Sequence, residues 1–201
     1  ICLMAKTGKK PKVLGLDIST KTIGWALFDI QSKDLLELTH FSPKIKVKTD
    51  SKVEEMMIKV DQFKTKLQDY QNFGITKVII EEPLISSNNI RTVATLIRYN
   101  SFITRVIYDV LGILPEFIST YDSRKFAFPS LFTENKKGKK VLFGAYTKGC
   151  DKKHIIWQKV SDKESHLTWV YTRNNTLKKE NYDMCDAYTC VLGQMNKINI
   201  W

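Results

Sequence analysis

One carboxylate interrupts the first apolar run of this 201-residue chain. Asp17 lies in the middle of the stretch KVLGLDISTKTIGWALF, which covers residues 12–28 and turns back on itself through the polar residues 19–22. A carboxylate in an apolar strand costs several kcal/mol to desolvate unless a cation or strong hydrogen-bond donors meet it. The stretch therefore predicts a hairpin whose central acid needs a cation or strong hydrogen-bond donors beside it.

Two further acidic features sit at the ends or edges of apolar elements. Glu81 and Glu82 follow the β-branched run of residues 78–80, and Asp183 and Asp186 lie near the carboxyl end of the chain. The three-residue spacing of the last pair places both side chains on one face of a helix, beside its apolar stripe. Since a first strand and the strand after a helical crossover are commonly neighbours, these acids can meet Asp17 in one pocket.

Clustered carboxylates repel one another unless cations hold them together. Oxygen ligands of this hard type select Mg²⁺, with Mn²⁺ as a substitute. Two such ions about 4 Å apart can activate a water molecule and stabilise the leaving oxygen of a phosphodiester. The acids at positions 17, 81, 183 and 186 therefore predict a magnesium site that holds two ions and hydrolyses a phosphodiester, with no small-molecule cofactor.

Each acid also has a purely structural interpretation. Asp17 can cap the turn that follows it, and Asp183 can be a favourable charge at the start of a helix capped by Asn181. Strand alternation decides between Glu81 and Glu82, and Pro83 favours an outward-facing Glu82. All three features occurring together is harder to explain structurally than any one of them.

The elements that must position the acids follow from the apolar periodicity. Strands are predicted at 13–18, 23–29, 35–41, 77–81 and 116–119, with amphipathic helices over 53–70, 93–110 and from about 181 onward. A further short strand is predicted at 168–171. The order β-β-β-α-β-α-β followed by helices indicates an α/β fold: a mixed five-stranded sheet with helices on both faces.

Composition limits the classes of partner. The formal net charge is +11 and 43% of residues are hydrophobic, which suits one domain over 12–201 behind a flexible basic tail over 1–11, and a polyanionic partner, nucleic acid before membrane surface. The sequence shows no run of about 20 apolar residues and no signal peptide, so we expect no membrane association and an intracellular location. The cytoplasm of a bacterial or phage-infected cell is the first expectation, and an organellar or viral setting stays open. The four cysteines have no zinc-ligand spacing.

A lysine-rich segment over 129–153 mixes cations with aromatic rings. Such a mixture can follow a phosphate backbone, although a solvated helical face has the same composition. The predicted DNA-binding lysines are Lys136, Lys137, Lys139, Lys140, Lys152 and Lys153.

Three motifs together resemble those of the RuvC-type Holliday-junction resolvases of the ribonuclease-H-like superfamily. They are Gly15-Leu16-Asp17-Ile18-Ser19 followed by Gly24-Trp25-Ala26, then Val78-Ile79-Ile80-Glu81 with Asn88 beyond it, and finally Asp183-x-x-Asp186-Ala187. The resemblance covers residues 12–195 and departs from the family at Ser19, where glycine is usual, and in the longer segments 129–148 and 161–180.

The resemblance implies that Asp17, Glu81, Asp183 and Asp186 are metal-binding catalytic acids in a homodimer that nicks two opposed strands of a four-way DNA junction. It also implies a basic residue at a helix start near the scissile phosphate, for which Lys152 is the candidate because it would stabilise developing negative charge. Any base preference would come from the 86–91 loop, through Asn88 and Arg91.

Three alternatives remain open at this stage. The same nuclease fold can act on other branched DNA or on an RNA–DNA hybrid. The Gly-x-Asp-x-Ser-Thr hairpin also resembles the phosphate loop of sugar kinases and actin-like ATPases, which need a second such loop that is not found in these 201 residues. A catalytically inactive nucleic-acid-binding module would have no use for four acids.

Overall fold

The chain folds around one five-stranded mixed sheet with the strand order β3-β2-β1-β4-β5. The structure is a computed structural model that describes residues 10–83, 89–134, 137–138, 140–142 and 149–201. Strands β1 (Lys12–Ile18), β2 (Ile23–Asp29) and β3 (Leu35–Phe41) form an antiparallel meander. Strands β4 (Ile75–Glu81) and β5 (Glu116–Ile118) run parallel to β1, so the predicted α/β fold with a mixed five-stranded sheet is confirmed.

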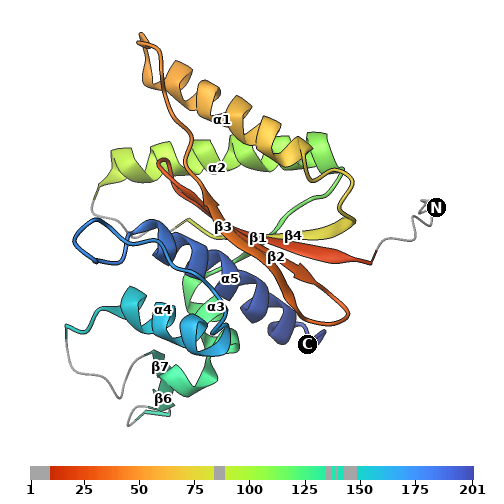
Figure 1. Cartoon of the computed structure of the whole chain (residues 1–201), viewed down its shortest axis with the longest axis vertical. Helices are drawn as coiled ribbons and strands as arrows, with labels where there is room; N and C mark the ends of the chain where they lie inside the picture. Colours follow the sequence, from red (N-terminus) through yellow and green to blue (C-terminus); the bar gives the residue numbers. More distant parts are fainter. Residues whose placement is uncertain (1–9, 84–88, 135–136, 139, 143–148) are drawn as a thin grey trace.

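Helices cover both faces of the sheet (Figure 1). Helices α1 (Lys52–Gln68) and α2 (Ile90–Leu111) pack on one face, and α3 (Thr120–Ala127), α4 (Lys152–Lys163) and α5 (Glu180–Lys197) lie on the other. A 3₁₀ turn (Pro129–Leu131) and a small hairpin of β6 (Phe132–Glu134) and β7 (Lys140–Leu142) follow α3. Within the described ranges, no helix is long and apolar enough to cross a membrane.

Strand alternation divides the core into two clusters. Leu14 and Leu16 of β1, together with Val78 and Ile80 of β4, pack against α1 and α2. Because successive side chains of a strand point to opposite faces, the odd-numbered residues of both strands face α5, as Val13 and Ile79 do. Asp17 and Glu81 fall on that same face.

One predicted element is wrong. The predicted strand at 168–171 is a loop whose ladder consists of a single antiparallel bridge between Tyr171 and Leu177. The side chain of Asn181 bonds both the N–H and the C=O of Val170, so this backbone is satisfied by an amide rather than by a neighbouring strand. Asn181 therefore fixes a loop instead of capping the last helix, which begins at Glu180.

Candidate metal centre

Helix α5 approaches the sheet very closely at two glycines. A Cβ on Gly15 would lie 2.5 Å from the carbonyl oxygen of Ala187, and a Cβ on Gly24 would lie 1.9 Å from that of Asp183. The two glycines sit on adjacent strands, where Asp17 pairs with Gly24. Only residues without a side chain let the α5 backbone pass this near to β1 and β2, so the glycines bring the acids of α5 to Asp17.

Three carboxylates from three elements converge at this place. Oxygen atoms of Asp17, Glu81 and Asp186 all lie within 4.8 Å of one another. Asp17 comes from β1, Glu81 from the carboxyl end of the parallel neighbour β4, and Asp186 from α5. Asp186 is 4% exposed, whereas the other two are partly buried. We call these three residues the acid cluster.

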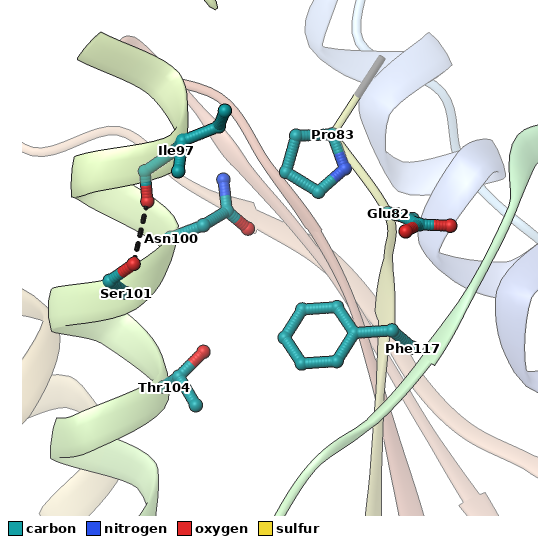
Figure 2. Close-up of a pocket in the computed structure, with 7 residues that line it drawn as sticks. All are labelled: Glu82, Pro83, Ile97, Asn100, Ser101, Thr104 and Phe117. Atoms are coloured by element: carbon teal, nitrogen blue, oxygen red, sulfur yellow. Dashed lines mark hydrogen bonds between the residues drawn. The ribbon is translucent and has the colours of Figure 1, made fainter. Parts of the chain in front are cut away.

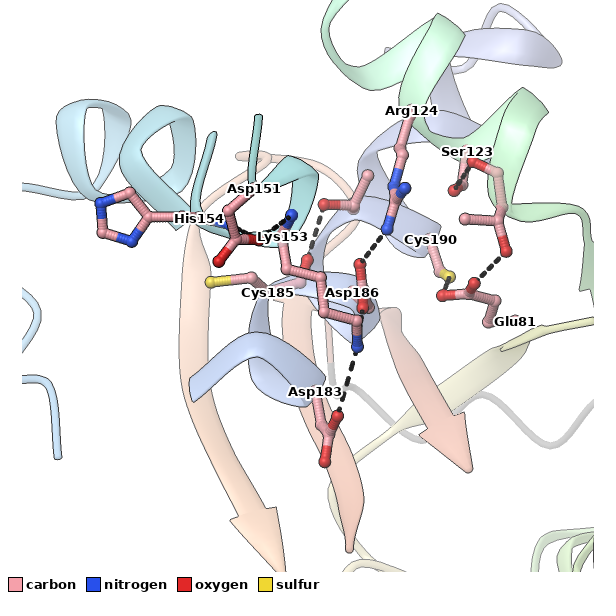
Figure 3. A network of polar contacts seen from close by, with 12 residues as sticks. Glu81, Ser123, Arg124, Asp151, Lys153, His154, Asp183, Cys185, Asp186 and Cys190 are labelled. Carbon is pink, nitrogen blue, oxygen red and sulfur yellow. Dashed lines mark hydrogen bonds and ion pairs between the residues drawn. The ribbon is translucent and has the colours of Figure 1, made fainter. Parts of the chain in front are cut away.

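Asp183 lies at the edge of the acid cluster, one helical turn before Asp186. The ammonium group of Lys153, at the start of α4, joins the two: its Nζ is 3.2 Å from an Asp186 oxygen and 3.8 Å from an Asp183 oxygen (Figure 3). The structure thus brings together all four predicted acids. Three of them lie within 4.8 Å of one another, and the fourth, Asp183, is linked to Asp186 by the ammonium group of Lys153.

Two side chains of α3 form hydrogen bonds with the acids of the cluster. Arg124, only 8% exposed, donates from Nη2 to Asp186 Oδ1 over 3.1 Å (Figure 3). The hydroxyl of Thr120 donates to Glu81 Oε1, and the thiol of Cys190 lies 3.9 Å from the other oxygen of Glu81. These contacts fix the orientation of two carboxylates whose like charges would otherwise push them apart.

The arrangement favours protonation of the acids when no cation is bound. Burial raises the pKa of Asp17 well above its usual range, and the charges of Glu81, Asp186 and Asp183 raise it further. Burial and then Asp186 raise the pKa of Glu81 to about 7, against the opposing effects of its Thr120 hydrogen bond and of nearby cations.

The pKa values of Asp183 and of Lys153 are both raised, for different physical reasons. Burial raises the pKa of Asp183 to about 6, with Lys153 opposing this change and Asp186 adding to it. Burial lowers the pKa of Lys153, but the carboxylates, Asp186 foremost, outweigh it and raise that pKa overall. Among the described residues, four acids lie close to two cations, Lys153 and Arg124, so the acids in their ionised form carry an excess of negative charge. Their hard oxygen donors fit Mg²⁺ or Mn²⁺.

The other predicted site residues are placed less centrally. Lys152 is exposed, and the ion pairs to Asp183 and Asp186 recorded among the described residues belong to Lys153 instead. Successive side chains of a helix differ in direction by about 100°. At the start of α4, the side chain at position 153 therefore points toward the acids and the side chain at position 152 does not. Arg91 is exposed near the start of α2 and lines a groove that also contains Ser19.

The predicted lysines of the 129–153 segment are described only in part. Lys137 is exposed, and Lys140 lies in β7. Asn88, Lys136 and Lys139 lie outside the described residues.

Sequence reasoning missed Arg124 and Thr120. Both lie on α3, which begins two residues after the end of β5. Because β5 pairs with β4 from Ile79 to Glu81, the start of α3 lies next to the end of β4. That parallel pairing was the available signal, since the carboxyl ends of adjacent parallel strands meet at one edge of a sheet. The burial of Arg124, by contrast, cannot be predicted from the residues next to it in the sequence.

The fold of the chain is similar to that of solved Holliday-junction resolvases. Thermus thermophilus RuvC in complex with a Holliday junction substrate superposes with a TM-score of 0.60 at 9% identity, over 94% of each chain. Another structure of RuvC from Thermus thermophilus gives a TM-score of 0.52 at 12% identity, over 94% of this chain and 95% of that one.

The yeast mitochondrial Holliday junction resolvase Ydc2 is equally similar, with a TM-score of 0.60 at 12% identity over 96% of this chain and 80% of that one. No protein-family model matches the sequence. No curated protein matches it either. At these identities the likeness establishes the shared fold.

Proposed function

We propose that this protein is a divalent-metal-dependent endonuclease that resolves four-way DNA junctions by paired nicks. The observation that carries the proposal is the acid cluster: three carboxylates from β1, β4 and α5 within 4.8 Å of one another. The fold shared with junction resolvases and the net charge of +11 support a branched polyanionic substrate.

Asp17, Glu81 and Asp186 would hold the metal, with Asp183 as a fourth ligand at the edge, and we expect two Mg²⁺ ions or Mn²⁺ in their place. Bound there, the metal would supply an activated water and charge stabilisation at the leaving oxygen of the phosphodiester. Arg124 and Thr120 would keep the ligands oriented. Lys153, which pairs with Asp183 and Asp186, would take the role that the resemblance implied for Lys152 and offset negative charge on the phosphate.

The direct test replaces Asp17 by asparagine, which keeps the size of the side chain and removes its charge. Asp17→Asn should abolish Mg²⁺-dependent nicking of a four-way junction and leave junction binding in EDTA within about twofold, because the positive surface is unchanged. Asp61→Asn, an exposed acid on α1, is the matched control and should nick normally. A folded Asp17→Asn protein that still nicks would refute the assignment.

The acid cluster and the positive charge serve other nucleic acids equally well. Replication forks, other branched DNA and RNA–DNA hybrids are therefore the second candidate substrates. A panel of these substrates at equal concentration separates the two proposals: symmetric paired nicks confined to four-way junctions support the first, and faster cleavage of forks or hybrids supports the second.

A homodimer forms part of the proposal, and one face of the molecule suits it. A groove of about 480 Å³ runs between α2 and β5, with Ile97 and Phe117 in its walls, 43% and 46% exposed (Figure 2). The Asn100 carbonyl oxygen and the Thr104 hydroxyl are buried beside it and have no hydrogen-bond partner among the described residues. A second copy of the chain would cover the apolar walls of this groove.

Sedimentation velocity tests the dimer. Ile97→Glu should shift the protein to monomer, because a buried unpaired charge at an interface costs several kcal/mol. Met57→Glu on α1, a residue exposed to a similar degree at 40%, should leave the oligomeric state unchanged. A wild-type protein that is monomeric both alone and on junction DNA would rule out this face as a dimer interface.

A further inference from the structure

A further groove, lined mainly by charged and hydroxyl side chains, opens beside the acid cluster. It has a volume of about 990 Å³ and includes Asp183 and Lys153 in its lining, so it is continuous with the candidate metal centre. This is the upper end of the roughly 300–1,000 Å³ range of ligand sites. The turn between β1 and β2 contributes Lys21 to one wall, and the segment before α5 contributes Lys178 and Lys179 to the other.

That second wall is a loop over residues 170–178, the part of the chain directly before α5 (Figure 1). Backbone bonds close it: Thr172 N–H donates to the Thr176 carbonyl over 2.8 Å and Lys178 N–H to the Val170 carbonyl over 3.0 Å. Asn175 turns the loop with a φ of +59°, a conformation that asparagine tolerates. We call this segment the 170–178 loop.

The loop is fixed to the helix that carries two of the acids. Asn181, with 0% exposure, donates from Nδ2 to the carbonyls of Val170 and Lys178 over 2.7 and 2.9 Å, and accepts from Val170 N–H over 3.0 Å. It lies two residues before Asp183. The hydrogen bonds of Asn181 therefore fix the positions of Lys178 and Lys179 relative to Asp183.

Three of the four lysines that line the groove are available to a ligand, and the fourth, Lys153, pairs with Asp183 and Asp186. No ion pair between described residues involves Lys21, Lys178 or Lys179. The lining also contains three acids, Asp151, Glu180 and Asp183. Asp151 caps α4, where it accepts from the N–H groups of Lys153 and His154, and Asp183 pairs with Lys153. The groove thus offers three unpaired cations, along with hydroxyl groups, next to a centre suited to phosphodiesters.

We propose that the 170–178 loop, the adjoining Lys179 and Lys21 form a binding wall for the phosphate backbone of the DNA strand that enters the acid cluster. The inference rests on the proposed nuclease function and deepens it. Cations spaced along a groove neutralise successive phosphates and release condensed counterions, so they contribute affinity and salt dependence without base specificity.

The test is the double variant Lys178→Gln/Lys179→Gln, which removes two charges at the start of α5. Binding of a four-way junction is measured in EDTA as a function of salt, so that no cleavage intervenes. We expect affinity on the order of tenfold weaker at low salt, and a log–log salt slope shallower by about 1.8, since each lost phosphate contact contributes about 0.9. Lys48→Gln/Lys64→Gln, two exposed lysines before and within α1, is the charge-matched control and should leave the slope unchanged.

The outcomes separate this inference from the proposed function. A wild-type protein that nicks junctions in Mg²⁺, with a double variant of unchanged affinity and slope, overturns the binding wall alone. A wild-type protein that neither binds nor nicks DNA overturns both. An equal loss in the control pair would show a general charge effect and would also overturn the binding wall.

Discussion

Removing one acid from the cluster should stabilise the metal-free protein. Glu81→Gln keeps the side-chain shape and an acceptor for the Thr120 hydroxyl, but eliminates a carboxylate whose pKa is raised from its ordinary 4.5 to about 7. A shift of that size corresponds to at most about 3 kcal/mol of unfavourable charge in the folded state at pH 8. Because Glu81 is partly exposed, we expect a gain of about 1–3 kcal/mol, or roughly 3–10 °C in Tm.

The sign of the effect fixes its pH dependence. A carboxylate whose folded pKa lies above its unfolded pKa stays protonated longer in the folded state, so folding is not penalised below about pH 4.5 and is penalised increasingly up to about pH 7. The stability of the metal-free wild-type protein should therefore fall across this window relative to Glu81→Gln. The two proteins should be nearly equal in Tm at pH 4.5 and differ fully at pH 8.

Thermal unfolding in EDTA and in excess Mg²⁺ measures both parts of the reasoning. Mg²⁺ at about 100 times its Kd should stabilise the wild-type protein by about 2.7 kcal/mol and the variant by much less, because a ligand is missing. Glu82→Gln is the matched control: the adjacent acid is exposed, and its loss should change stability by less than about 0.5 kcal/mol.

Two results would refute this reasoning. One is a Glu81→Gln protein that is less stable than wild type in EDTA at pH 8 while Glu82→Gln is unchanged. The other is a stability difference that does not vary between pH 4.5 and 8, because it would then have no electrostatic origin.

Two further substitutions test how the site is built. Gly24→Ala places a methyl group against the Asp183 carbonyl, so it should cost about 1–3 kcal/mol in urea unfolding and reduce nicking. The control Gly112→Ala meets no atom but has a φ of +70°, so it should cost about 1–2 kcal/mol and leave nicking intact. Equal nicking activity in the two variants would contradict the close approach of α5. Arg124→Met removes the buried partner of Asp186 and leaves Lys153 as its ion pair among the described residues. It should cost about 1–3 kcal/mol in EDTA, with part of the loss restored by Mg²⁺. A loss below about 0.5 kcal/mol would show that the Arg124 pair is not needed to hold the acid.

The sequence alone determined the order and type of the main elements, because apolar periodicity is a local property of the chain. The strands at 23–29 and 35–41 coincide with β2 and β3. Alternation along β4 together with Pro83 also selected Glu81 over Glu82, and the structure places Glu81 on the α5 side as one member of the acid cluster. These predictions needed only a two-residue or 3.6-residue repeat.

Tertiary structure decided which side chains meet. Whether position 152 or 153 carries its lysine to the acids depends on the rotation of α4 about its axis, which is set by packing and not by the spacing of charges. The same holds for Arg124, whose burial beside Asp186 results from the docking of α3 against α5. It also holds for Asn181, whose side chain satisfies the backbone of Val170 where a strand was predicted. The acids could be found one by one in the sequence, but their mutual distances are set by contacts between residues far apart along the chain, down to the two glycines that let α5 reach the sheet.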